Sequence, residues 1–257
     1  MRRINRPIAA LASLFLALAL YLCFAWDKEA EPPAMPAMEG KELNNFKAIL
    51  RPARYDESDD KIELAVFFWY GCGACRESEA TTTLFTGSLP EDVRVVRLPA
   101  LFETRMPFQT HGRLFLVLDE LGVETAARQA AFDTAQQIYN QNRRGYGLVT
   151  KESQETFAAS QGVSRASFNA TYDSLAVTGR EARIKAFMDN SGLDAVPAMV
   201  INGRYVITYF DGPFYQLAEK TINYERERLA YEKQAKPEPA AETAGAAAPG
   251  PDKAKSE

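Results

Sequence analysis

The sequence predicts an α/β fold in which a block of helices interrupts a mixed β-sheet. An apolar and aromatic run over 62–70 is followed by a helical pattern and then by a second strand pattern, which together predict a β-α-β unit. Helical patterns then continue as far as residue 191. After them, two short strands flank Asn202-Gly203, a dipeptide typical of tight hairpin turns.

The first unit predicts a buried central strand followed by a helix. Residues 62–70 are too few and too rich in β-branched and aromatic types for a typical helix, so we expect a strand that Gly71 ends. The segment 75–85 is the expected helix, and 93–98 is the expected second strand.

Capping residues mark the helical block. Apolar residues at helical spacing predict a helix over 111–121, with Gly122 as its C-terminal cap. Ser164 is the expected N-cap of a later helix, and Gly192 is expected to stop the last one.

The final part of the fold is a hairpin and a helix. Strands are expected over 198–201 and 205–208, because turn residues separate two β-prone runs. The last helix is expected to begin near Pro213 and Phe214.

The N-terminus predicts export from the cytoplasm. Three arginines precede an apolar run over 8–26, and acidic residues follow it, which orients the rest of the chain away from the cytoplasm. Cys23 and Ala25 offer a cleavage site for a signal peptide, whereas Trp26 suits an interfacial membrane anchor. The sequence therefore predicts a periplasmic domain that is either soluble after cleavage or tethered to the inner membrane by residues 8–26.

These patterns divide the chain into six parts. We expect a signal peptide or anchor at 1–26, a linker at 27–39, a first part of the fold at 40–102, a helical insertion at 103–192, a second part of the fold at 193–234, and a disordered tail at 235–257. The tail is dominated by Ala, Pro, Lys and Glu, a composition that cannot bury enough apolar surface to fold.

Composition excludes several classes of function. A net charge of −4 in 257 residues leaves no broad basic surface for nucleic acid. The chain has three cysteines, too few for a disulfide-stapled scaffold. A four-ligand zinc site would need all three and the single His111, and Cys23 lies in the expected export segment, so we expect no metal.

Cys72 and Cys75 are the candidate catalytic residues. Cys72 precedes the N-terminus of the expected helix, where unpaired backbone N–H groups favour the thiolate that attacks disulfides. Cys75, one turn later, is placed to resolve a mixed disulfide. The other interpretation, an inert staple, is disfavoured because so short a loop gives only about 2 kcal/mol, against about 4.7 for a loop of about 100 residues.

Three segments resemble the DsbA family of bacterial thiol:disulfide interchange proteins. They are FWYGCGAC at 68–75, VPAM at 196–199 and NGRY at 202–205. The resemblance implies a thioredoxin fold with an inserted helical domain and a periplasmic dithiol oxidase that introduces disulfides into exported proteins. It also implies that Val196-Pro197 faces the cysteines with Pro197 in the cis form; a trans Pro197 opening the hairpin strand is the alternative.

The resemblance extends to substrate and partners. Val196 and Pro197 would hold an extended peptide beside Cys72 by main-chain pairing, and Trp69 and Tyr70 lie close enough to the cysteines to line the same groove. The redox group would be the Cys72–Cys75 disulfide itself, with no cofactor. The implied partners are unfolded or reduced exported polypeptides and a membrane oxidase of the DsbB type.

The chain departs from the family pattern at two places. Gly73-Ala74 between the cysteines offers no side-chain donor to the thiolate, where the family often has Pro-His. The missing hydrogen bond would move the reduction potential by roughly 30 to 60 mV towards the reducing side. Val66 stands where many relatives carry a buried Glu. The absence of that carboxylate favours the thiolate and moves the reduction potential in the opposite direction. Glu63 does not replace it, because odd spacing along a strand places it on the other face.

The sequence is also compatible with two other functions. The same site could run as a disulfide reductase or isomerase, or the domain could be a redox-inert, membrane-tethered peptide-binding module. His111, the single histidine, is expected to be a surface or capping residue rather than a catalytic one.

Overall fold

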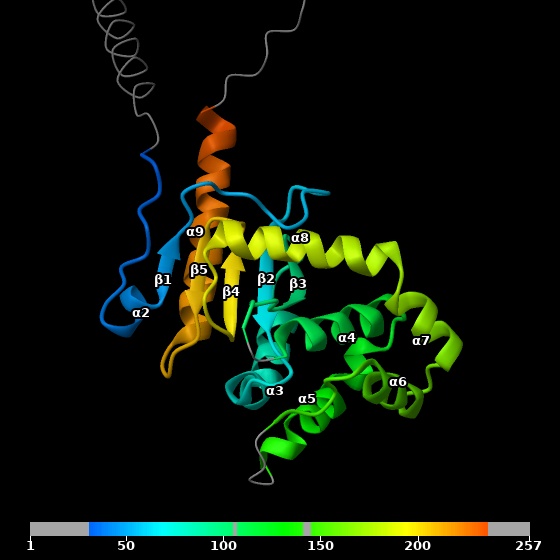
Figure 1. The fold of residues 1–257 in the computed structure, drawn as a ribbon. Helices are drawn as coiled ribbons and strands as arrows, with labels where there is room; N and C mark the ends of the chain where they lie inside the picture. Colours follow the sequence, from blue (N-terminus) through cyan, green and yellow to red (C-terminus); the bar gives the residue numbers. More distant parts are fainter. Residues whose placement is uncertain (1–30, 105–106, 141–144, 236–257) are drawn as a thin grey trace, which may run out of the picture. The chain divides into compact units, whose positions relative to one another are not determined.

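A mixed β-sheet forms the centre of the computed structural model, which describes residues 31–104, 107–140 and 145–235 (Figure 1). Its five strands lie in the order β1-β5-β4-β2-β3. Only β2 and β3 are parallel to each other, as the β-α-β connection requires, and the remaining pairs are antiparallel. The strands are β1 (Phe46–Ala48), β2 (Ile62–Phe68), β3 (Val93–Pro99), β4 (Ala198–Ile201) and β5 (Tyr205–Thr208).

Helices α4 to α8 occupy the chain between β3 and β4. The described helices are α2 (Lys41–Asn44), α3 (Gly73–Gly87), α4 (Phe108–Glu120), α5 (Glu124–Asn140), α6 (Lys151–Ser160), α7 (Arg165–Tyr172), α8 (Leu175–Ser191) and α9 (Phe214–Ala235). The predicted strands and helices are confirmed, and β1 and α2 are additional elements that the sequence patterns did not indicate.

The predicted caps are in place. The Ser164 side chain accepts a hydrogen bond from the Ser167 backbone N–H at the start of α7. Gly192 ends α8 in the left-handed conformation with φ 63°, which glycine adopts without a steric penalty. The hairpin turn places Asn202 and Gly203 at φ 50° and 59°, as a turn of this type demands.

Helices cover both faces of the sheet. Phe67 of β2 stacks on Phe187 of α8 with ring centroids 5.9 Å apart, so α8 covers one face (Figure 1). Val66 points the other way and is in register with Arg97 of β3, which forms an ion pair with Glu79 of α3. The helix that carries the cysteines therefore packs against the face opposite α8.

The unit built around this sheet comprises Ala34–Glu227. Residues 31–33 and 228–235 belong to a second unit, in which Arg228 forms an ion pair with Glu232. Helix α9 includes Ala235, the first residue of the expected tail. The predicted export segment 8–26 and the tail from Lys236 onward lie outside the described residues. Among the residues described, no helix has the length and apolar character needed to cross a bilayer.

Candidate active site

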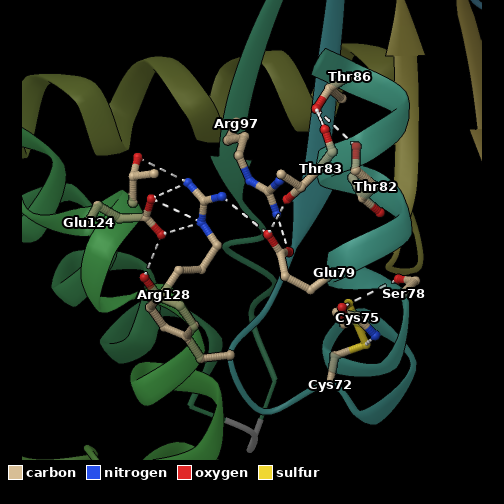
Figure 2. A network of polar contacts seen from close by, with 12 residues as sticks. Cys72, Cys75, Ser78, Glu79, Thr82, Thr83, Thr86, Arg97, Glu124 and Arg128 are labelled. Atoms are coloured by element: carbon tan, nitrogen blue, oxygen red, sulfur yellow. Dashed lines mark hydrogen bonds and ion pairs between the residues drawn. A yellow bond between two sulfur atoms is a disulfide. The ribbon is translucent and has the colours of Figure 1, made fainter. Parts of the chain in front are cut away.

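The two cysteines lie where β2 passes into α3 and are joined by a disulfide (Figure 2). Cys72 is the N-cap of α3, and the backbone N–H of Cys75 donates a hydrogen bond to the Cys72 Sγ at 3.1 Å. The Cys75 side chain is buried, whereas Cys72 is half-buried and lines a surface groove. Cys72 is thus the sulfur that a second molecule can reach, and it sits among the free N–H groups of a helix N-terminus.

A tight turn connects the strand to the cysteines. The Cys72 backbone N–H donates to the Trp69 carbonyl at 2.9 Å, which ends β2 at Phe68, two residues earlier than the sequence predicts. Gly71 lies directly against Trp69, because a Cβ built at position 71 would approach the indole Cζ2 to 2.3 Å. Only glycine fits beneath this side chain without a shift of the ring.

The Val196–Pro197 peptide bond is cis, which confirms the conformation that the resemblance implies. The Val196 carbonyl oxygen lies 3.6 Å from the Cys72 Sγ, across 124 residues of sequence. The Pro197 carbonyl accepts a hydrogen bond from the Tyr209 backbone N–H at 2.8 Å, so the turn is anchored to the chain that follows β5. The main chain at Val196 therefore borders Cys72 directly.

The groove beside Cys72 has a volume of about 870 Å³. Apolar and aromatic side chains form much of its wall: Trp69, Phe102, Phe108, Tyr146 and Val196. Trp69 stacks on Phe108 with ring centroids 4.1 Å apart. Four charged residues also line it: Arg76, Glu77, Glu103 and Asp194. The combination of aromatic wall, charged residues and exposed main chain suits an extended peptide.

The expected groove residues divide into those that reach it and those that do not. Trp69, Gly73 and Val196 line it, whereas Ala74 and Pro197 lie beside it without forming its wall. Tyr70 corrects our expectation: its side chain is buried, with the hydroxyl donating to Glu124 at 3.0 Å. Successive residues at the end of a strand point in opposite directions, so Trp69 and Tyr70 do not share one wall.

An amide from α5 holds the loop between β2 and Cys72. The Gln136 Nε2 donates to the Tyr70 carbonyl at 2.9 Å and to the Cys72 carbonyl at 3.1 Å. Gln136 is 6% exposed and is part of the groove lining. No local pattern of the sequence indicated this residue, because its two acceptors lie more than sixty positions earlier.

A buried charged network lies between α3, β3 and α5, one turn along α3 from Cys75 (Figure 2). The Glu79 carboxylate is held between two guanidinium groups, in an ion pair with Arg97 and at 3.1 Å from the Arg128 Nη1. Arg128 also binds Glu124, the acceptor of the Tyr70 hydroxyl. One sequence pattern points to this network: Glu79 follows Cys75 by four positions and so shares its helix face.

The pKa values of Tyr70 and Arg128 are both raised within this network. Burial, and then the charge of Glu124, raise the pKa of Tyr70 well above its usual range. Burial opposes the charge of Arg128, but its hydrogen bond to Glu124 and the carboxylate charges raise its pKa overall. Both groups therefore keep one protonation state throughout the pH range in which thiols react.

His111 is buried, so our expectation of a surface or capping residue was wrong. Its ring lies near Trp69, with centroids 5.8 Å apart, and its Nε2 is 2.8 Å from the Gly147 carbonyl. Burial lowers the pKa of His111 to about 4, so the ring is neutral near pH 7. The position of the ring is determined by its packing against Trp69 and its contact with Gly147, not by its place at the start of a helix.

Glu63 and Val66 lie as the strand pattern predicts. Val66 is buried on the α3 face, and Glu63 is at the opposite end of β2 from the cysteines. The Glu63 carboxylate accepts the backbone N–H groups of Tyr55 and Asp56 at 2.7 and 2.8 Å. It has no part in the cysteine site. Within the described ranges there is also no group of three or more His, Cys, Asp or Glu side chains that could hold a metal ion.

Known proteins with this arrangement are numerous, although no family model matches the chain. Thiol:disulfide interchange protein DsbA of Pseudomonas syringae pv. tomato is 34% identical over 217 residues, covering 82% of this chain and 93% of that protein. DsbA of Pseudomonas aeruginosa is 36% identical over 175 residues, covering 67% and 79%.

Solved structures agree with the sequence relatives. A crystal structure of Pseudomonas aeruginosa DsbA has a TM-score of 0.61 at 33% identity, covering 73% of this chain and 94% of that one. DsbA from Xylella fastidiosa has a TM-score of 0.65 at 23% identity, covering 75% and 99%, which supports the thioredoxin fold with its helical insertion. The chain belongs to the DsbA family and is a thiol:disulfide oxidoreductase that exchanges electrons through Cys72 and Cys75.

Proposed function

We propose that this protein acts as an oxidase in the periplasm, transferring its Cys72–Cys75 disulfide to reduced, unfolded polypeptides that have been exported. The observation that carries the proposal is the position of Cys72: it is the accessible sulfur, at a helix N-terminus, on the floor of a groove that Val196 borders. The charged N-terminus and the apolar run 8–26 support export.

The exchange proceeds in two displacements. A substrate thiolate attacks the Cys72 Sγ, the Cys72–Cys75 bond breaks, and the Cys75 sulfur leaves as a thiolate that takes up a proton. A second substrate thiolate then attacks the substrate sulfur of the mixed disulfide and releases the Cys72 thiolate, which the N-terminus of α3 and the Cys75 N–H stabilise. Two electrons pass from the substrate dithiol to the protein.

Substrate recognition is through main chain more than side chains. An extended peptide lies along Val196, pairs with its backbone, and packs its own side chains on Trp69. Pro197 fixes the course of the chain at this point because its ring locks φ. It also has no backbone N–H that could compete for the peptide. Gly73 leaves the approach to Cys72 open, because nothing lies within 4 Å of the place where its Cβ would be.

Reoxidation requires a partner. A membrane oxidase of the DsbB type accepts the two electrons from reduced Cys72 and Cys75 and restores the disulfide. The redox pair then needs no added cofactor, because the disulfide itself carries the electrons.

The proposal is tested by mixing the oxidised chain with a reduced, unfolded polypeptide that contains two cysteines, and following substrate disulfide formation by mass spectrometry. We expect transfer by the unchanged chain, loss of transfer in Cys72→Ser, and full transfer in Cys23→Ser, the matched control for removing a cysteine. Equal transfer by Cys72→Ser and the unchanged chain contradicts the proposal.

Two further measurements separate the alternatives. A reduction potential near that of thioredoxin, about −270 mV, indicates a reductase or isomerase instead. In a strain lacking its own oxidase, complementation that survives loss of both Cys72 and Cys75 indicates a redox-inert binding module.

A further inference from the structure

The side-chain amide of Gln136 binds the two carbonyls on either side of Gly71. Its Nε2 carries two hydrogens, and each has one acceptor: the Tyr70 carbonyl at 2.9 Å and the Cys72 carbonyl at 3.1 Å. The amide oxygen accepts no hydrogen bond from any described residue. The nitrogen is therefore fully used, and it is used only on the loop that carries Cys72.

This loop sets the geometry of the reactive sulfur. The Cys72 carbonyl accepts the Arg76 backbone N–H at 3.1 Å as well as the Gln136 amide, so α3 and α5 meet on one oxygen. The Tyr70 carbonyl lies two residues earlier, in a residue that is 1% exposed. A buried carbonyl without a hydrogen-bond donor raises the free energy of the folded state. Without Gln136 we therefore expect the loop to adopt another conformation.

The same bonds act on the charge of the sulfur. A carbonyl oxygen carries partial negative charge, which opposes a thiolate nearby, and an N–H bound to that oxygen offsets it. The stabilising donor for the Cys72 Sγ is the Cys75 N–H at 3.1 Å, and its aim depends on the turn that Gln136 holds.

We infer that Gln136 is a positioning residue of the exchange reaction: acting through the Tyr70 and Cys72 carbonyls, it holds the loop so that the reduced protein keeps Cys72 as a reactive thiolate. It makes no contact of its own with the sulfur. The inference rests on the proposed function, because it concerns the sulfur that the substrate attacks.

The chain supplies a matched control. Gln154 of α6 also donates two hydrogen bonds to main-chain carbonyls. Its Nε2 donates to the Thr110 carbonyl at 2.9 Å and to the Leu148 carbonyl at 2.8 Å. Its side chain is fully buried, at 0% exposure, and none of its contacts involves the cysteine loop. Removing either amide takes one donor from each of two carbonyls, but only the pair that binds Gln136 adjoins Cys72.

The experiment compares the full chain with Gln136→Leu, Gln136→Met and Gln154→Leu. Thiolate absorbance near 240 nm gives the titration midpoint of Cys72 in the reduced state, and equilibration with glutathione gives the redox equilibrium constant. We expect both Gln136 variants to raise the titration midpoint of Cys72 by about 0.5 to 1 pH unit. We expect them to lower the equilibrium constant for reduction of the Cys72–Cys75 disulfide by glutathione roughly three- to tenfold. We expect Gln154→Leu to change neither.

The outcomes distinguish this inference from the proposed function. The inference alone is overturned if the unchanged chain equilibrates with glutathione and the folded Gln136 variants have the same titration midpoint and equilibrium constant as Gln154→Leu. An unchanged chain that fails to oxidise a dithiol overturns the proposed function.

A measurement on the unsubstituted protein covers variants that fail to fold. In ¹⁵N-labelled reduced protein, the side-chain amide resonance of Gln136 is expected to shift with the ionisation of Cys72, while that of Gln154 stays constant. A Gln136 resonance that does not respond also overturns the inference.

Discussion

Glu79 of α3 and Arg97 of β3 form a buried ion pair, with side chains only 11% and 13% exposed. Glu79 is the single carboxylate that contacts both Arg97 and Arg128 among the described residues. Arg128 has Glu124 as a second carboxylate partner, whereas Glu79 is the only carboxylate in an ion pair with Arg97 among the described residues.

Replacing Glu79 should therefore destabilise the protein strongly. We expect Glu79→Ala to lower the free energy of unfolding by about 3 to 5 kcal/mol, because it leaves buried positive charge without its partner. Urea unfolding measures this. Lys47→Ala, which breaks the exposed pair with Asp194, is the control and should cost less than about 1 kcal/mol. Similar losses of unfolding free energy in Glu79→Ala and Lys47→Ala would show that burial of the network does not increase its contribution to stability.

Gly71 and Gly73 should respond in opposite ways to a methyl group. Gly71→Ala places a Cβ only 2.3 Å from the Trp69 Cζ2, so we expect the indole to move, tryptophan fluorescence to change, and stability to fall by about 1 to 3 kcal/mol. Gly73→Ala meets open space and should keep the stability of the unchanged chain. Because Trp69 forms a wall of the groove, the KM for a peptide dithiol should rise in Gly71→Ala. An unaltered indole spectrum would disprove the close contact.

Tyr70→Phe tests the buried position of that hydroxyl. We expect a loss of about 1 to 2 kcal/mol in unfolding free energy, because Glu124 loses a buried donor. The KM for a peptide dithiol should stay the same, since the side chain does not reach the groove. A higher KM with unchanged stability would restore Tyr70 to the peptide site.

Stability should fall as the pH is lowered from 6.5 to 4 because of His111. Its pKa is about 4 in the folded protein and about 6.5 in the unfolded chain, so in this window the unfolded chain binds the extra proton. The contribution is fully present above pH 6.5 and decreases by about 3 kcal/mol by pH 4.

The matching measurement is urea unfolding of the unchanged chain and of His111→Gln at several pH values. The variant should show a flatter pH dependence over this window, whatever its absolute stability. Parallel curves for the two proteins would mean that His111 titrates normally in the fold.

The sequence predicts features of this protein that depend on neighbours in the chain. The Asn202-Gly203 turn, the Gly192 stop and the strand-to-helix junction at Cys72 follow from local conformational preferences. The cis form of Pro197 came from family resemblance, because local preference favours trans.

The errors and omissions share another cause. His111 and Tyr70 were misplaced because partners distant in sequence, Gly147 and Glu124, decide where their side chains lie. Gln136 looks like any polar residue of a helix until the fold brings it to the cysteine loop. Such residues carry a signal only in three dimensions.

The Gln136 bridge also bears on the order in which the protein matures. In a newly made chain Cys72 and Cys75 are three positions apart and can meet at once, whereas the amide must arrive from a helix synthesised sixty-four positions after Cys72. Contacts of such separation form late, because a long loop must close first. A half-folded molecule therefore holds both sulfurs close together before the amide that binds their loop has arrived.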